Sequence, residues 1–263
     1  RGGRAPDGHG ATVESTLDVW DQHLAHIGAQ LLAARLELVE RLRPHVATAY
    51  EQLTDGSKAA QLAYRSSIAG FVPDEDGQLS ADDQSSRGGE AAPSDVEDGT
   101  AAAPSGSGLE ALTVGEIAER YLAALAAARP QELERGLSLV GPHRDELELL
   151  LGPAPAKGFA SHGETWSFAL ALRLASYYVM LDDSTVEGDE PILILDDVFA
   201  ELDTQRRARL AAIVVRAEQV IVTAAVDGDI PAELAGRRIR VVPGGIEADT
   251  EAGPRAEPDA VGE

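Results

Sequence analysis

The feature that most constrains the fold is a short apolar run followed by two acids, P-I-L-I-L-D-D at residues 191–197. Ile192 to Leu195 follow one another without polar alternation, which is typical of a strand buried on both faces of a parallel sheet. Ligands of such sheets bind beyond the carboxyl ends of the strands. Because Asp196 and Asp197 follow the run directly, the pattern predicts a binding crevice lined by paired carboxylates.

Paired acids in this position suit phosphate chemistry. Mg²⁺ is usually held by one or two carboxylates together with substrate phosphates. In phosphoryl transfer the first acid, Asp196, would hold the metal, and the second, Asp197, would position or deprotonate a water molecule. This is the Walker B pattern. The motif is short, and a buried strand that runs into an acidic loop or a helix N-terminus fits it equally well.

Composition narrows the class of protein. The 263 residues include no cysteine, which excludes disulfides and thiolate zinc sites and fits the reducing cytoplasm. No signal peptide and no run of roughly 18 apolar residues is present, so we expect a cytoplasmic protein with no membrane partner. The formal net charge of −23 normally argues against nucleic-acid binding. Acids are concentrated in 72–110 and 244–263, but the remainder is acidic too.

An amphipathic helix is predicted near the N-terminus, where apolar side chains with heptad-like spacing share one helical face. Pro44 is expected to break or kink this helix. The stripe predicts a helix packed within its own domain or, alternatively, an arm for a partner, and about three heptads are short for a coiled coil. The stripe consists of Leu17, Trp20, Leu24, Ile27, Leu31, Ala34 and Leu38.

Three further segments follow. Alternating side chains predict a strand within 58–68. Residues 72–108 are rich in Gly, Ser, Asp, Ala and Pro and lack apolar periodicity, so they predict a disordered insertion. Thr113 and Glu116 have the spacing of a capping box at the start of a helix, and Pro130 is expected to end that helix.

Leucines alternate with other residues across 136–151, which predicts two strand segments with a turn at Gly141-Pro142. His143, Arg144 and Asp145 lie at that turn. They fit a contact with phosphate or with a partner subunit, and they fit a local salt-bridged corner equally well.

A helix is predicted over Thr165–Leu181, directly after S-H-G-E at 161–164. Ser161 suits the N-cap and leaves the first backbone N–H groups free, while Gly163 lets an oxyanion approach the backbone. A helix N-terminus favours phosphate. Capped helix starts are common, so this feature alone is weak.

The order of the motifs is more specific. S-H-G-E precedes the paired acids by about thirty residues, and A-E-L-D at 200–203 follows them. This order resembles the C-terminal half of an ABC-type ATPase head, with signature, Walker B and D-loop. With G-P-H-R-D at 141–145 and L-D-D-V-F-A-E-L-D-T-Q-R-R-A-R-L at 195–210, the sequence is similar to the RecF family of bacterial DNA replication and repair proteins, which are related to SMC-type ATPases.

The resemblance implies a role for each matching residue. Asp196 would be the Walker B acid near Mg²⁺, and Asp197 would replace the catalytic glutamate of many relatives. Aspartate is one methylene shorter, so slow hydrolysis is expected. The residues that would contact ATP bound by the opposite subunit are Ser161, His162, Gly163 and Glu164. Those at the D-loop and on the following helix, near the dimer interface, are Asp203, Arg206 and Arg207.

Two departures accompany the resemblance. No G-x-x-x-x-G-K-[ST] phosphate loop occurs, and the chain starts at Arg1 with Met180 as its one methionine. We therefore expect a fragment whose N-terminal part, with the phosphate loop, is missing; proteolytic maturation is the alternative. The strand 220–222 is followed by T-A-A, where many ABC heads carry a switch histidine.

The predicted fold class is α/β, the C-terminal part of the P-loop lobe of an ABC-type ATPase head with a helical second lobe. Strands 192–195 and 220–222 should be parallel neighbours. The predicted segments are a disordered start (1–13), part of the helical lobe (14–70), an acidic disordered insertion (71–110), a further helix of that lobe (111–135), the ATPase lobe (136–243) and an acidic disordered tail (244–263).

By resemblance, the function is that of an ATP- and Mg²⁺-dependent DNA-binding protein of replication and recombinational repair. It would dimerise on ATP, engage single-stranded and gapped DNA, assist recombinase loading with RecO/RecR-type mediators, and hydrolyse ATP weakly. The alternatives are another SMC-like ABC ATPase, a transporter ATPase subunit, or a non-catalytic interaction module, since a chain without a phosphate loop would not cradle ATP alone.

Overall fold

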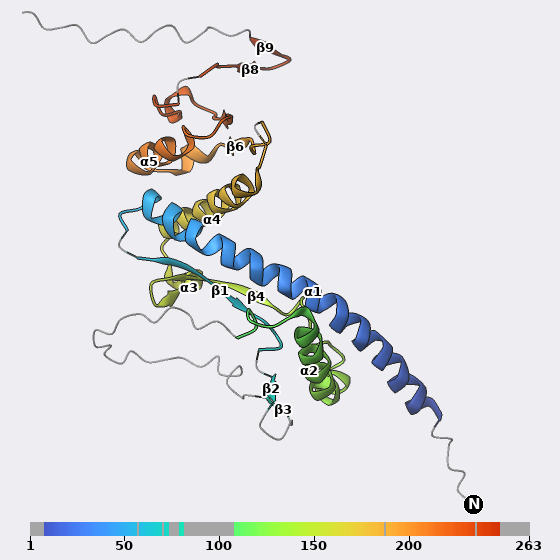
Figure 1. Cartoon of the computed structure of the whole chain (residues 1–263). Coiled ribbons are helices and arrows are strands. Elements are labelled where there is room, and N and C mark those ends of the chain that lie inside the picture. The colour runs from blue at the N-terminus through green and yellow to red at the C-terminus, as the bar shows by residue number, and fades with distance from the viewer. Residues whose placement is uncertain are drawn as a thin grey trace, which may run out of the picture. The chain divides into compact units, whose positions relative to one another are not determined.

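The computed structural model describes residues 8–56, 58–69, 71–73, 79–81, 108–186, 188–234 and 236–247 (Figure 1). The chain divides into two compact units. Unit 1 comprises Arg1–Glu51 and Asp55–Val179, and unit 2 comprises Gln52–Thr54 and Met180–Glu263. The long helices α1 (Gly8–Leu53) and α4 (His162–Asp183) both lie mostly in unit 1.

Unit 1 contains an antiparallel sheet in the order β1-β4-β5. Strands β1 (Ala60–Arg65) and β4 (Glu146–Leu151) pair along their full length. The prediction of a strand within 58–68 is confirmed. The other elements of the unit are β2 (Phe71–Pro73), β3 (Leu79–Ala81), α2 (Val114–Arg135), β5 (Ala154–Pro155) and α3 (Ala156–Phe159).

The core of unit 1 lies between α1, α2 and the loops beside the sheet (Figure 1). Tyr121 of α2 is fully buried there. A Cβ atom added at Gly28 of α1 would lie 3.3 Å from Pro142, so this glycine allows the 141–145 turn to approach the helix closely. The buried side chains of this cluster include Ala25, Ala29, Leu32, Leu36, Ile68, Leu109, Ile117, Ala124, Leu125 and Val140.

The predicted helix is confirmed, but most of the heptad stripe does not pack within its own unit, which was one of the two readings of the sequence. Four large members of the heptad stripe are exposed: Trp20 (67%), Ile27 (61%), Leu31 (41%) and Leu38 (47%). The core instead receives a neighbouring stripe with small residues at its N-terminal end, where the close approach to the 141–145 turn takes place. The two stripes are both apolar, so periodicity alone did not decide which one packs.

Neither proline ends its helix. Pro44 lies inside α1, so it does not break that helix, and Pro130 lies inside α2, so the predicted end of α2 is wrong. Both prolines are exposed, and α1 buries residues on both sides of Pro44, including Leu42 and Val46, so tertiary packing there outweighs the loss of one backbone hydrogen bond. The capping box of Thr113 and Glu116 at the start of α2 is confirmed, and α2 ends at Gly136 in the left-handed conformation.

The first of the two strands predicted within 136–151 is not formed, and the second is β4. The carboxylate of Glu132 at the end of α2 accepts hydrogen bonds from the backbone N–H groups of Leu139 and Val140. Because these donors bond to a side chain rather than to a neighbouring strand, the segment runs as a loop.

Unit 2 is built on two parallel strands, β6 (Leu193–Asp196) and β7 (Val220–Thr223). Their parallel pairing, predicted from the sequence, is confirmed. Between them run the 3₁₀ turn η2 (Val198–Glu201) and helix α5 (Thr204–Val214). The turn η3 (Asp227–Asp229) and the hairpin of β8 (Arg240–Val242) and β9 (Gly245–Glu247) follow.

The prediction that β6 is buried on both faces is wrong. Leu195 is 4% exposed, but Ile194 is 63% exposed and Ile221 of β7 is 43% exposed. One face of the pair therefore packs on the core of unit 2, which includes Phe199 and Leu210, and the other face is open.

The structure describes only parts of the segments predicted to be disordered. Residues 8–13 lie in α1 and 245–247 form β9, so disorder was wrongly predicted there. Within the predicted insertion, β2 and β3 pair with each other, and 82–107 lie outside the described residues. None of the helices described is long and apolar enough to cross a membrane.

Candidate functional site

The paired acids lie at the carboxyl end of β6, as predicted from the sequence. The register places Asp196 opposite Thr223, the last residue of β7. The Thr223 hydroxyl donates a hydrogen bond to Oδ1 of Asp196 and accepts one from the backbone N–H of Asp197 at 3.1 Å. All three residues are exposed. Two carboxylates and a hydroxyl thus share one edge of the parallel sheet, the edge at which ligands bind.

Asp197 has an unusual backbone conformation. Its φ of 52° and ψ of 22° place it in the left-handed region, and no other non-glycine residue in the described part of the chain has a positive φ. Aspartate tolerates this region better than most side chains, at a cost of about 1–2 kcal/mol. Strain of this kind clusters at functional sites. Here it ends β6 abruptly and turns the chain into η2.

The segment after the acids is held within unit 2. Asp203 is the N-cap of α5 and accepts a hydrogen bond from the N–H of Arg206 at 2.9 Å. Arg207 donates to the carbonyl of Leu202 at 2.9 Å and pairs with Asp229 at 2.9 Å. Both contacts of Arg207 lie within its own unit, although the sequence suggested a contact with a partner subunit.

The predicted helix start at 161–164 is a capping box in unit 1. Oγ of Ser161 accepts a hydrogen bond from the N–H of Glu164 at 3.3 Å, and the Glu164 carboxylate accepts one from the N–H of Ser161 at 2.8 Å. The N–H groups of His162 and Gly163 lie in the first turn of α4, where the helix supplies no acceptor. Ser161 is thus the helix cap that the sequence predicted.

Glu164 has a second partner that the sequence did not suggest. Lys58 lies 2.6 Å from its carboxylate. This ammonium group, together with the hydrogen bonds from Ser161, holds the pKa of Glu164 at about 2. The carboxylate therefore stays charged at neutral pH and closes the capping box.

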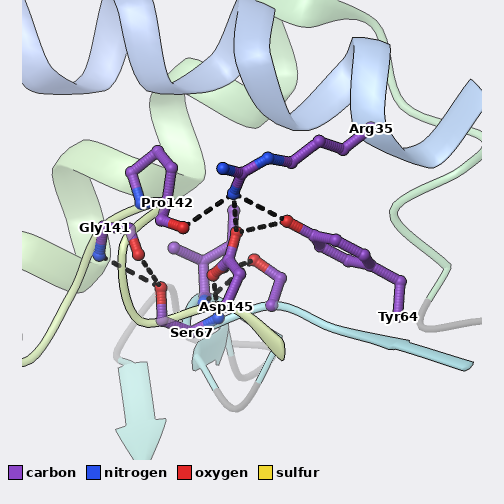
Figure 2. Close-up of polar contacts among 8 residues, drawn as sticks. Arg35, Tyr64, Ser67, Gly141, Pro142 and Asp145 are labelled. Atoms are coloured by element: carbon purple, nitrogen blue, oxygen red, sulfur yellow. Dashed lines mark hydrogen bonds and ion pairs between the residues drawn. The ribbon is translucent and has the colours of Figure 1, made fainter. Parts of the chain in front are cut away.

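The turn at 141–145 is held by a polar network in unit 1 (Figure 2). Asp145 has a fully buried side chain that accepts hydrogen bonds from the Tyr64 hydroxyl (3.0 Å), the Ser66 hydroxyl (3.3 Å) and the N–H of Ser67 (2.7 Å). Arg35 of α1 donates to Tyr64 (3.1 Å) and to the carbonyl of Pro142 (2.7 Å).

This network raises the pKa of two tyrosines. Burial, reinforced by the charge of Asp145, raises the pKa of Tyr64, and the same causes raise that of Tyr121 further. The sequence offered a salt-bridged corner of three residues, and of these Asp145 forms one, through its hydrogen bonds and an ion pair with Arg35 at 4.0 Å. His143 and Arg144 are exposed at its tip, which leaves open a contact with phosphate or a partner.

The acid pair fits Mg²⁺ held jointly with phosphate. Hard oxygen donors are present, and the described residues contain no group of three or more His, Cys, Asp or Glu side chains that would hold a metal ion alone. Mg²⁺ typically takes one or two carboxylates and completes its shell with water and phosphate oxygens. Thr223, which the sequence marked as a departure from the histidine of other heads, is the site residue that sequence reasoning missed.

No family model matches the chain, but comparison with individual proteins is informative. This chain is 62% identical over 247 residues to the DNA replication and repair protein RecF of Arthrobacter sp. (strain FB24). The match covers 94% of this chain and 57% of that protein. RecF of Paenarthrobacter aurescens (strain TC1) is 61% identical over 95% of this chain and 58% of its own length. RecF of Streptomyces avermitilis is 50% identical over 89% of this chain and 51% of its own length.

Two solved structures of the recombination mediator protein RecF share the fold. The RecF-ATPrS structure superposes with a TM-score of 0.62 at 19% identity, covering 89% of this chain and 50% of that chain. The RecF-ATP structure superposes with a TM-score of 0.60 at 18% identity, and the match covers 90% of this chain and 50% of that chain.

Over the half of those chains that it covers, the chain therefore shares the fold of the solved RecF structures, and the predicted α/β class is confirmed. Over nearly all of its own length, the chain is similar to RecF proteins of several bacteria. It spans a little over half the length of the curated relatives it matches.

Proposed function

We propose that this chain forms part of an ATP-dependent DNA replication and repair protein. In this proposal ATP closes a homodimer on single-stranded or gapped duplex DNA, RecO/RecR-type mediators assist recombinase loading, and weak ATP hydrolysis reopens the dimer. Support comes from the RecF relatives and from solved structures of RecF described with ATP and ATPrS in the RecFOR pathway. The observation that carries the proposal is the acid pair at the carboxyl end of β6.

Each acid has a distinct task in the proposed reaction. Asp196, at the end of the strand, would hold Mg²⁺ together with the ATP phosphates, and the ion would supply positive charge that stabilises the negative charge of the phosphate oxygens. Asp197, turned by its left-handed backbone, would orient the attacking water and accept its proton. Its side chain is one methylene shorter than glutamate, which is consistent with slow hydrolysis.

The start of α4 would complete the site of the other subunit. In this arrangement Ser161 and the first N–H groups of the helix, at His162 and Gly163, contact the γ-phosphate of ATP bound by the partner. Glu164 keeps the helix start in shape through its bonds to Ser161 and Lys58. Asp203 caps the helix that follows the D-loop at the proposed dimer interface.

The test of the acid pair uses a full-length protein that carries this chain together with a phosphate loop. Asp197→Asn should bind ATP normally, hydrolyse it about 100-fold more slowly or worse, and hold the ATP-bound dimer longer, because the base is lost and the metal ligand is kept. Glu146→Gln, an exposed acid of unit 1, is the matched control and should hydrolyse normally. A normal rate in Asp197→Asn overturns the assignment.

The composite site has its own test. Ser161→Arg should leave ATP binding by each monomer nearly intact and abolish ATP-dependent dimerisation in analytical ultracentrifugation. Mixing it with Asp197→Asn should restore part of the phosphate release. The heterodimer has one complete site, in which ATP held by the Ser161→Arg chain meets the intact Ser161 of its partner. Ser161→Arg protein that still dimerises with ATP would show that Ser161 is a helix cap only.

A non-catalytic interaction module is the second candidate, favoured by the absence of a phosphate loop from this sequence. It predicts that the chain alone neither binds ATP in calorimetry nor releases phosphate, and that a full-length protein is equally inactive. Another SMC-like ABC ATPase predicts Mg²⁺-dependent ATPase activity that gapped DNA does not change.

A further inference from the structure

We propose that Thr223 is a positioning residue of the paired-acid site and holds both acids through one hydroxyl group. The inference rests on the proposed ATPase function, which it deepens. Nothing in the sequence pattern marks Thr223 for this task. The task follows from the parallel pairing of β6 and β7, which brings the ends of the two strands together.

The hydroxyl of Thr223 is used in two directions. It donates to Oδ1 of Asp196 and accepts the N–H of Asp197 at 3.1 Å. A hydroxyl has one donor and two acceptor lone pairs, so both bonds can exist together. The side chain of Asp196 is an acceptor and the backbone N–H of Asp197 is a donor. Both therefore bond to the same oxygen atom, that of the Thr223 hydroxyl.

Each bond fixes something that the proposed chemistry needs. The bond to Oδ1 of Asp196 sets the rotation of that carboxylate and leaves Oδ2 for a metal ion. The N–H of Asp197 is shared between the Thr223 hydroxyl, at 3.1 Å, and the Thr223 carbonyl, at 3.2 Å, so the hydroxyl adds a second acceptor that holds the left-handed turn. Groups that orient metal ligands are worth about 10–100-fold in metal affinity or activity when removed.

A matched pair of variants isolates the hydroxyl. Thr223→Val keeps the size and the branched Cβ that suits a strand, and removes the oxygen. Thr223→Ser keeps the oxygen and removes the methyl group. Thr223 is exposed, so both variants should fold, and equal melting temperatures for the two would confirm it. Thr223→Ala replaces Thr223→Val should the valine prove unstable.

The first measurement uses this chain without nucleotide. Amide hydrogen exchange at Asp197, followed by NMR, should accelerate several-fold or more in Thr223→Val and stay near the unmodified rate in Thr223→Ser. Unchanged exchange in the valine variant would show that the hydroxyl does not hold the Asp197 turn and would overturn the proposal.

The second measurement uses a full-length protein with its phosphate loop and titrates Mg²⁺ at saturating ATP. We expect Thr223→Val to need about 10-fold more Mg²⁺ for half-maximal hydrolysis and to lose about 10-fold in kcat, with ATP binding unchanged, and Thr223→Ser to restore both. An Asp197→Asn control distinguishes failure of the proposed function from failure of the role of Thr223. If Asp197→Asn hydrolyses ATP at the normal rate, the proposed function is overturned. If Asp197→Asn is inactive and Thr223→Val has normal kcat and Mg²⁺ dependence, only the role of Thr223 is overturned.

Discussion

Units 1 and 2 differ in how completely their apolar side chains are buried. Unit 1 surrounds its core with two helices and an antiparallel sheet, and it buries a carboxylate, Asp145, inside a hydrogen-bonded network. Unit 2 covers one face of a two-stranded parallel sheet and leaves Ile194 and Ile221 exposed on the other. Parallel sheets are almost always covered on both faces. The proposed chemistry therefore lies in unit 2, the unit whose sheet has one exposed face.

The two units also use their polar side chains differently. In unit 1, polar side chains are used to hold a turn against α1, and the exposed His143 and Arg144 are what remains available for contact. In unit 2, exposed polar groups at the ends of the strands are the site itself.

The largest expected effect compares one buried and one exposed aliphatic side chain. Leu32→Ala in unit 1 should cost about 3–4 kcal/mol of unfolding free energy, because Leu32 is fully buried and its removal leaves a cavity. Ile194→Ala in unit 2 should cost under about 1 kcal/mol, since the side chain is 63% exposed. Urea unfolding followed by hydrogen-exchange mass spectrometry reads each unit separately. Equal costs would contradict the contrast between the two units.

A smaller effect tests the network of Figure 2. Asp145→Ala leaves the Tyr64 hydroxyl and the N–H of Ser67 without their acceptor, and should cost about 2–3 kcal/mol. Glu146→Ala, its exposed neighbour, is the control and should change stability by less than about 0.5 kcal/mol. Tryptophan fluorescence suits this measurement because both tryptophans, Trp20 and Trp166, lie in unit 1. A neutral Asp145→Ala would mean that the corner is held by packing alone.

The smallest effect is a pH dependence in unit 1. The pKa of Glu164 is lowered from 4.5 to about 2. Its contribution to stability is therefore complete above pH 4.5 and is lost as the pH falls towards 2. Glu164→Gln should lower the melting temperature by about 1–2 °C at pH 7, because exposed pairs are weak. The deficit should shrink as the pH falls from 4.5 towards 2. A deficit that does not change with pH would indicate that Lys58 and Glu164 are not paired in solution.

Local patterns were predictable where the chemistry is local. The capping box of Thr113 and Glu116 and the N-cap Ser161 depend only on residues three apart, and both are present. The acid pair after an apolar run correctly predicted the end of a parallel strand, because strand length and the position of charge are properties of adjacent residues. The resemblance to the RecF family likewise came from short motifs in a particular order.

Other features depended on contacts between distant segments. The sequence of α1 contains two apolar stripes, and only the approach of α2 and the 141–145 turn to Gly28 selects the one that is buried. Pro44 remains inside α1 because the packing of residues on both sides of it outweighs one lost hydrogen bond, and α2 likewise continues past Pro130 to Arg135.

The site shows the same division. By itself the sequence determined which residues carry charge at the end of β6 and which residue caps α4. The tertiary structure decided that Thr223, 27 positions beyond Asp196, joins the two acids, that Lys58 pairs with Glu164, and that Asp145 is buried. The physical reason is that a hydrogen bond needs its atoms within about 3 Å of each other. Spacing along the chain sets that distance within a turn or a cap, whereas between strands and helices the fold sets it.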